Sequence, residues 1–212
     1  GLGVKPMMDY SFLSRAFGML SAETWQSINQ SLCSQALAEG KIDGKKMRLD
    51  STVYETNIHY PTDSSLLWDS FRTLARLLRR IGKELPELGL SHRYHDKKIK
   101  RLATFISRNG SSHCRGTQRQ VKRAYRKLIE RVAWIADISG EVLEAIGGLS
   151  LKTAELEHYT PIVERIIGQA RRRVLEGEQV PASEKVYSLF EEHTELLKRG
   201  KAGKPIEFGH KA

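Results

Sequence analysis

The sequence predicts an α/β fold of the α+β type that is mostly helical by residue count, and two observations predict it. Strand-forming runs stand at residues 46–54 and again after residue 184. Between them lies a block of about 110 residues whose apolar side chains recur with helical periodicity. Because the flanking strands could pair with each other, we expect the helices to be inserted between them.

The first predicted helix covers residues 21–39. Ser21 or Thr24 can cap its start, and Gly40 can end it. One apolar face recurs at helical spacing and consists of Trp25, Ile28, Leu32 and Ala36.

The first predicted strand, residues 46–54, carries an aspartate in its middle. Side chains alternate along a strand, so Asp50 lies opposite the more apolar side. Aspartate is depleted in strands, which makes a functional role for this carboxylate worth testing. We expect Asp50 to hold a metal ion that acts on nucleic-acid phosphates.

Four helical segments are predicted in the central block, over residues 64–82, 97–108, 117–146 and 150–176. Thr62, Asp63 or Ser64 can cap the first of them. The first and third segments carry narrow apolar seams with steps of four and three residues, which favour a helical hairpin or a small bundle. These seams are Leu67, Phe71, Leu74, Leu78 and Ile81, and then Val121, Tyr125, Leu128, Val132 and Ile135.

Two further strands are predicted at residues 185–190 and 205–210, with a turn region between them.

Positive charge is concentrated in the central block. The chain has a formal net charge of +10, but residues 70–131 alone contain 18 Lys and Arg against four acidic residues. Such a block is typical of a DNA or RNA footprint, and its alternative is a solvated helical face. The predicted nucleic-acid-binding residues are Arg79, Arg80, Lys97, Lys98, Arg119, Lys122, Arg123, Arg126 and Lys127.

Composition narrows the class of protein. At 212 residues with 40% hydrophobic and 28% charged residues, the chain fits a globular protein, and no run is long enough to span a membrane. Two isolated cysteines favour a reducing, cytoplasmic compartment. Both ends of the sequence look cut, so we expect it to be part of a longer protein.

Residues 49–67, LDSTVYETNIHYPTDSSLL, resemble the first catalytic block of DDE-type insertion-sequence transposases of the ISNCY-like group. A second similar stretch, EKVYSLFEEHT at 184–194, continues into GKPIEFGHK at 203–211. The resemblance implies an RNase H-like core of three antiparallel strands in a meander, whose first strand carries the first catalytic aspartate, here Asp50. The second Asp and the Glu of the family's triad have no matching position in this chain.

The resemblance therefore implies a partial catalytic core, residues 46–60 and 184–212. A helical segment, residues 1–45, precedes this core, and a basic helical insertion, residues 61–183, interrupts it. It implies a fragment of a transposase that cuts and joins DNA by metal-dependent phosphoryl transfer and is inactive alone. Mg²⁺ would be the cofactor of the full-length protein, with Asp50 as one ligand. The implied partners are the double-stranded DNA of transposon ends and further copies of the full-length protein, in the bacterial cytoplasm.

Two alternatives remain open from the residues. One is a non-enzymatic DNA-binding helical protein in which Asp50 is structural. The other is a helical oligomerisation module without salt-sensitive affinity for DNA.

Overall fold

The computed structural model divides the chain into two units, residues 1–50 and residues 51–212, which are described separately. The structure describes residues 10–43, 53–147, 153–198, 200, 203 and 205–211. Asp50 and most of the first predicted strand lie outside these ranges.

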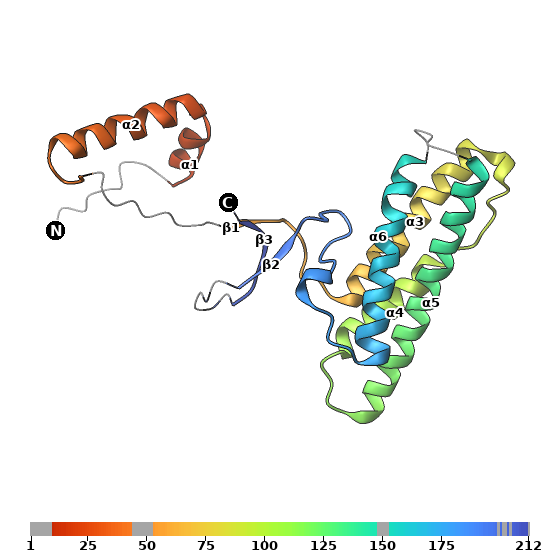
Figure 1. Ribbon diagram of the computed structural model, residues 1–212. Coiled ribbons are helices and arrows are strands. Elements are labelled where there is room, and N and C mark those ends of the chain that lie inside the picture. The colour runs from red at the N-terminus through yellow and green to blue at the C-terminus, as the bar shows by residue number, and fades with distance from the viewer. Residues whose placement is uncertain are drawn as a thin grey trace. The chain divides into compact units, whose positions relative to one another are not determined.

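The described part of the N-terminal unit contains two helices, α1 (Tyr10–Gly18) and α2 (Ala22–Ala38) (Figure 1). Ser21 caps α2 by accepting a hydrogen bond of 3.3 Å from the backbone N–H of Thr24. Of the two predicted caps, Ser21 is therefore the one that the helix uses. Gly40 follows the helix in the left-handed region, at φ +66°. The predicted apolar face of α2 lies at the surface, since no residue of this helix is buried.

Four of the described helices form the centre of the second unit, and Figure 1 shows them packed together. They are α3 (Asp63–Glu84), α4 (Asp96–Asn109), α5 (Arg115–Ile146) and α6 (Ala154–Ala170), which continues into the π-helical turn η2 (Arg171–Glu176). Short 3₁₀ turns lie at η1 (Pro86–Leu88) and η3 (Ala182–Glu184). Helices α3 and α5 pack on each other, and both contact α4 and α6. The predicted bundle is confirmed for these described helices.

The core of the bundle is formed by the predicted seams. Every seam residue of α3 is fully buried, and so are Leu128, Val132 and Ile135 of α5. Val121 and Tyr125, nearer the start of α5, are only partly buried against the core. A helix that places its apolar side chains at steps of three and four presents one stripe to its neighbours, and burial of that stripe stabilises the bundle.

A small antiparallel sheet accompanies the bundle. It consists of β1 (Val53–Glu55), β2 (Glu195–Leu197) and β3 (Glu207–Lys211), in the order β1-β3-β2. Strand β1 thus pairs with β3 across the whole helical block, with Tyr54 opposite His210. The predicted pairing of the flanking segments is confirmed, but the strand order is not that of a meander, in which β2 would lie in the middle.

The prediction of a strand at residues 185–190 is wrong. Its apolar side chains Val186 and Leu189 are buried in the core of the bundle, and the Val186 N–H donates to the Gln169 side chain at 2.8 Å instead of to a strand. The Ser188 hydroxyl then accepts hydrogen bonds of 3.2 Å from the N–H groups of Phe190 and Glu191, which bends the chain. The second strand forms at β2 instead, within the predicted turn region.

Replacing Gly209 by alanine should separate β1 from β3. A Cβ atom at Gly209 would lie 2.0 Å from the carbonyl oxygen of Tyr54, and a backbone neighbour cannot move aside without losing the ladder. Hydrogen exchange should show fast exchange of the Thr56 amide, which donates to the Phe208 carbonyl at 3.0 Å, while amides of the bundle stay protected.

The matched control is Gly140→Ala on α5, where an added Cβ meets nothing within 4 Å. Alanine is favoured over glycine within a helix by about 1 kcal/mol, so this variant should keep the sheet and melt at the same temperature or higher. Unchanged protection of Thr56 in Gly209→Ala would contradict the register of the sheet.

Candidate nucleic-acid interface

All nine predicted nucleic-acid-binding side chains are exposed, but two of them have acidic partners. Arg80 on α3 pairs with Glu155 on α6 at 3.0 Å. Arg79 pairs with Asp96 at the start of α4, and its guanidinium also lies over the ring of Tyr94, 4.9 Å from the centroid. Both arginines therefore join helices of the bundle, and their charge is partly neutralised.

Lys122 is also engaged, because its ammonium donates to the backbone carbonyl of Leu175 at 2.9 Å. That carbonyl belongs to the last turn before Gly177, whose left-handed conformation ends the helix.

The other six predicted side chains form no ion pair within the described ranges. They lie on α4 and on the first half of α5, two consecutive helices that pack against each other. On α5 they recur at helical spacing, which places them on one side of the helix. The six are Lys97, Lys98, Arg119, Arg123, Arg126 and Lys127.

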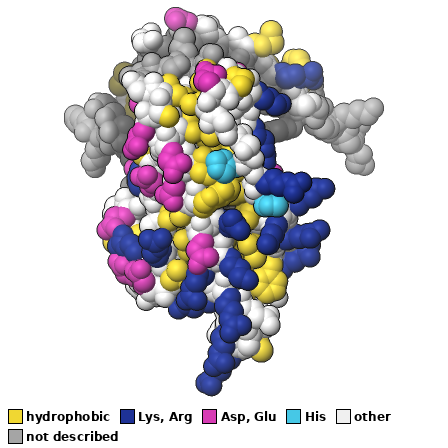
Figure 2. Space-filling model, turned by 90° about the vertical axis from the view of Figure 1, so that its right-hand side faces the viewer, with side chains coloured by type: hydrophobic (Ala, Val, Ile, Leu, Met, Phe, Trp, Pro, Cys, Tyr) yellow, Lys and Arg dark blue, Asp and Glu magenta, His cyan; other side chains and the backbone are white. Residues whose placement is uncertain are grey.

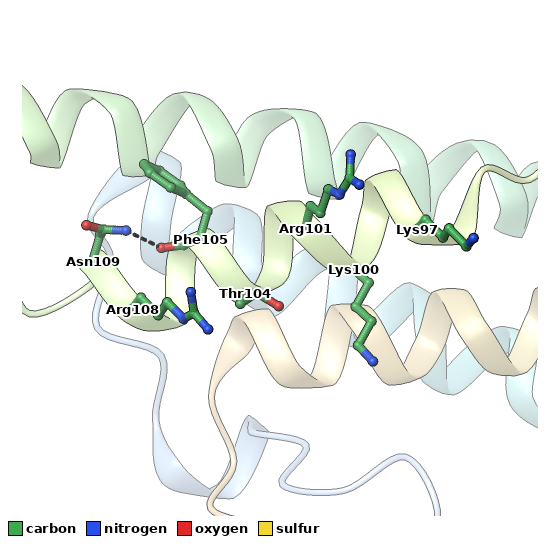
Figure 3. Close-up of a pocket in the computed structure, with 7 residues that line it drawn as sticks. All are labelled: Lys97, Lys100, Arg101, Thr104, Phe105, Arg108 and Asn109. Carbon is green, nitrogen blue, oxygen red and sulfur yellow. Dashed lines mark hydrogen bonds between the residues drawn. The ribbon is translucent and has the colours of Figure 1, made fainter.

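A hollow of about 550 Å³ lies along the exposed face of α4, as Figure 3 shows. Four cations line this hollow, and three of them were not among the predicted nucleic-acid-binding residues: Lys100, Arg101 and Arg108. The spacing of Lys97, Arg101 and Arg108 by four and seven residues was the signal that could have found them, since it places them on one helix face. The lining residues are Lys97, Lys100, Arg101, Thr104, Phe105, Arg108 and Asn109.

Figure 2 shows how charge is distributed over one face of the molecule. Lys and Arg side chains gather along one side and towards the lower end, whereas most Asp and Glu side chains gather on the opposite side. The cations of α4 and α5 that form no ion pair with another described residue are the candidate interface for a polyanion.

The segment that resembles the transposase motif forms the junction between β1 and α3. Thr62 caps α3: its hydroxyl accepts from the Ser65 N–H at 3.2 Å, and the Ser65 hydroxyl accepts from the Thr62 N–H at 3.0 Å. This reciprocal pair selects Thr62 among the three predicted caps. Thr62 and Ser65 of this segment therefore have a structural role, because they begin α3.

Asp63 is buried next to this cap and is bound from two sides. Arg173 donates to one carboxylate oxygen at 2.8 Å, and the Gln169 amide donates to the other at 3.1 Å. Gln169 in turn accepts from the Val186 N–H, so that one network joins the start of α3, the end of α6 and the segment that leads to β2.

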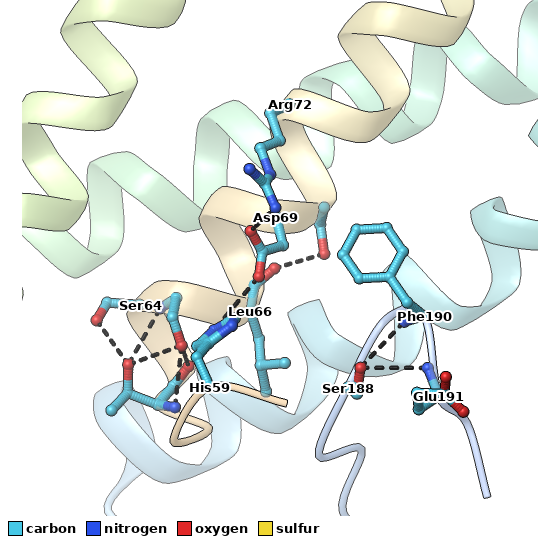
Figure 4. Close-up of polar contacts among 11 residues, drawn as sticks. His59, Ser64, Leu66, Asp69, Arg72, Ser188, Phe190 and Glu191 are labelled. Carbon is cyan, nitrogen blue, oxygen red and sulfur yellow. Dashed lines mark hydrogen bonds and ion pairs between the residues drawn. The ribbon is translucent and has the colours of Figure 1, made fainter. Parts of the chain in front are cut away.

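Asp69, six residues further along α3, is also buried. Arg72 lies 2.9 Å and His59 3.4 Å from its carboxylate oxygens, as Figure 4 shows. Burial raises the pKa of the Asp69 carboxyl, and the nearby Arg72 and His59 oppose part of that rise. His59, which belongs to the segment that resembles the transposase motif, thus pairs with Asp69.

The predicted magnesium ligand, Asp50, lies outside the described residues, three positions before β1. Among the described carboxylates, Asp63 pairs with Arg173, Asp69 pairs with Arg72, and Glu192 lies 3.3 Å from His158. No group of three or more His, Cys, Asp or Glu side chains with the geometry of a metal site occurs within the described ranges.

Comparisons of the chain with protein families, with curated proteins and with solved structures gave no match. None of the described helices is both long enough and apolar enough to cross a membrane.

The raised pKa of Asp69 predicts a pH dependence of stability. A carboxyl whose pKa is higher in the folded state stabilises the fold below its ordinary value, near 4, and this contribution is lost as the pH rises through the folded value. In a His59→Gln background, which removes the neighbouring imidazole, the chain with Asp69 should lose stability relative to Asp69→Asn between acid and neutral pH.

Urea unfolding at a series of pH values measures the free energy of unfolding of both chains. If the difference between these two free energies does not change with pH, or if the chain with Asp69 becomes relatively more stable as the pH rises, the buried environment assigned to this carboxyl is wrong.

Proposed function

We propose that this chain is part of a DDE-type DNA transposase whose helical unit binds double-stranded DNA through α4 and α5. The observation that carries the proposal is the set of exposed cations on these two helices that have no acidic partner among the described residues. Cations already paired within a protein gain little from a phosphate, whereas unpaired ones release counterions from DNA when they bind.

The resemblance of residues 49–67 supplies the catalytic part of the proposal. Asp50 would be one carboxylate ligand of Mg²⁺. When bound, this ion would neutralise the charge of the phosphoryl group and activate the attacking oxygen. The chain's own contribution is to fix the strand that follows Asp50, because β1 pairs with β3 and leads into the capped start of α3. An RNase H-like core remains part of this proposal.

A second candidate is a non-enzymatic DNA-binding protein. It is supported by the same basic surface and by the protein partners of Asp63 and Asp69, which leave neither carboxylate available as a metal ligand. The two candidates make the same prediction for DNA binding and differ in the role of Asp50.

Neutralising Lys97 and Arg101 together, as Lys97→Gln/Arg101→Gln, should weaken binding to double-stranded DNA and lower its salt dependence. Each phosphate contact contributes about 0.9 to the slope of log K against log salt, so the slope should fall by about two. Fluorescence anisotropy with labelled duplex DNA at several salt concentrations measures this.

The charge-matched control is Arg165→Gln/Arg171→Gln, which removes two exposed cations from α6 and its extension. It should leave the salt slope close to that of the unaltered chain. Equal effects of the two double variants would show non-specific attraction by net charge and would overturn the assignment to α4.

The transposase proposal also predicts that the 212-residue chain alone does not cleave DNA in the presence of Mg²⁺. The resemblance gives a position in this chain for only one carboxylate of the triad, and one carboxylate holds Mg²⁺ weakly. Cleavage and strand transfer on transposon-end DNA measure this, and activity that Asp50→Asn abolished would show that the chain carries a complete site.

A further inference from the structure

Three hollows adjoin one another along α4. The hollow of Figure 3 shares Lys97 and Arg101 with a hollow of about 440 Å³. That second hollow shares His95 and Asp96 with a third, of about 550 Å³. At 1.5 Å per residue, the three together follow the helix for about 20 Å, from His95 to Asn109. These three hollows are called the α4 groove.

The α4 groove is lined by seven Lys and Arg side chains and by one carboxylate. The carboxylate belongs to Asp96 and is paired with Arg79. The other six cations form no ion pair with any described residue. A groove with this balance of charge attracts a chain of phosphates. The six cations are Arg93, Lys97, Lys98, Lys100, Arg101 and Arg108.

The groove also contains an aromatic side chain. The ring of Phe105 is half-buried, since it packs against the core of the bundle and also lines the hollow. Figure 3 shows Phe105 and Arg101 on one flank of α4, and Lys100 and Arg108 on the other flank. An aromatic ring therefore lies within a set of cations.

These two features fit an unpaired strand of nucleic acid better than a duplex. In a duplex the faces of the bases are covered by neighbouring base pairs, so a protein contacts phosphates, sugars and base edges. In a single strand the bases can stack on aromatic side chains while the phosphates follow a basic groove. At 3.4 Å per nucleotide, the length of the α4 groove corresponds to about six nucleotides.

Two polar side chains next to the ring can bind the edge of a base. The side-chain amide of Asn109 donates to the Phe105 carbonyl at 2.8 Å, which holds Asn109 at the end of α4. Its amide oxygen can accept from an exocyclic amino group, and the exposed Thr104 hydroxyl can donate or accept. The hollow can therefore hold one base by its face and by its edge.

We propose that the α4 groove binds a single strand of DNA, with one base stacked on Phe105. The strand extends from the duplex that α4 and α5 bind. This inference rests on the proposed DNA binding, and it names the part of the DNA that the groove holds.

The test compares two DNA duplexes by fluorescence anisotropy, one with a short overhang of thymine nucleotides and one with the same overhang made of abasic nucleotides. Both carry the same phosphates, so only the bases differ. The unaltered chain should bind the thymine overhang about fivefold more tightly, the lower end of the range for one stacked base. Phe105→Leu keeps an apolar side chain and removes the ring, so it should abolish this preference. Its affinity for a blunt duplex should stay the same, because no charge is lost.

The matched control is Phe190→Leu, which makes the same exchange at an exposed phenylalanine outside the groove and should keep the preference. Thermal melting shows whether both variants are folded. Fluorescence of 2-aminopurine in the overhang measures stacking on the unaltered chain itself and should be quenched on binding.

Equal affinity of the unaltered chain for the thymine and abasic overhangs, together with binding of the blunt duplex, would overturn this inference and leave the proposed duplex binding intact. A folded Phe105→Leu variant that keeps the full preference, or 2-aminopurine that is not quenched, would also overturn it. Failure to bind any of the three probes would overturn the proposed function as well.

Discussion

The carboxylate of Asp63 is buried where the strand β1 leads into α3, and the rest of the second unit depends on how that charge is satisfied. A buried carboxylate without partners would cost several kcal/mol or take up a proton. Arg173 and Gln169 bind it from α6 and its extension, and Gln169 also accepts from the backbone of Val186. The entry of the chain into the bundle and its exit towards the sheet are therefore fixed by one network, and the short ladder between β1 and β3 can form across the whole helical block.

A helix seam is a local pattern, and this is why the helices could be predicted from the sequence. The steps of four and three residues in α3 require burial on one side whatever the partner is, and all five seam residues are fully buried. The run at residues 185–190 is also apolar, but it can be buried either in the core of the bundle or at the edge of the sheet. Its structure depends on which of these two buries it better. Val186 and Leu189 gain more burial in the core of the bundle than an edge strand of a three-stranded sheet offers, and Gln169 satisfies the Val186 N–H. No periodicity within six residues reveals such a partner.

For the candidate interface too, the sequence does not reveal partners that lie far away along the chain. The sequence shows which residues are basic, but only the fold shows which of them are already neutralised. Arg80 is paired with Glu155, which lies 75 residues away along the chain, and Lys122 donates to a carbonyl 53 residues away. The exposed cations of α4 and α5 that have no acidic partner in the described part of the chain include Lys100, Arg101 and Arg108, which a helical projection of α4 could have identified. The metal ligand that the resemblance places at Asp50 lies outside the described residues, so this role stays a prediction.

The two units differ in the kind of contact that their surfaces can make. Residues 70–131 carry an excess of 14 positive charges, and copies of such a surface repel each other unless a polyanion or salt lies between them. Association through the helical unit alone would therefore oppose its own charge. A nearly neutral unit with an apolar helix face has no such barrier, because apolar burial is insensitive to the sign of nearby charges and weakens little with moderate salt. The basic surface therefore favours a polyanion as its ligand, whereas charge contributes little to any contact that the apolar residues of the N-terminal unit make.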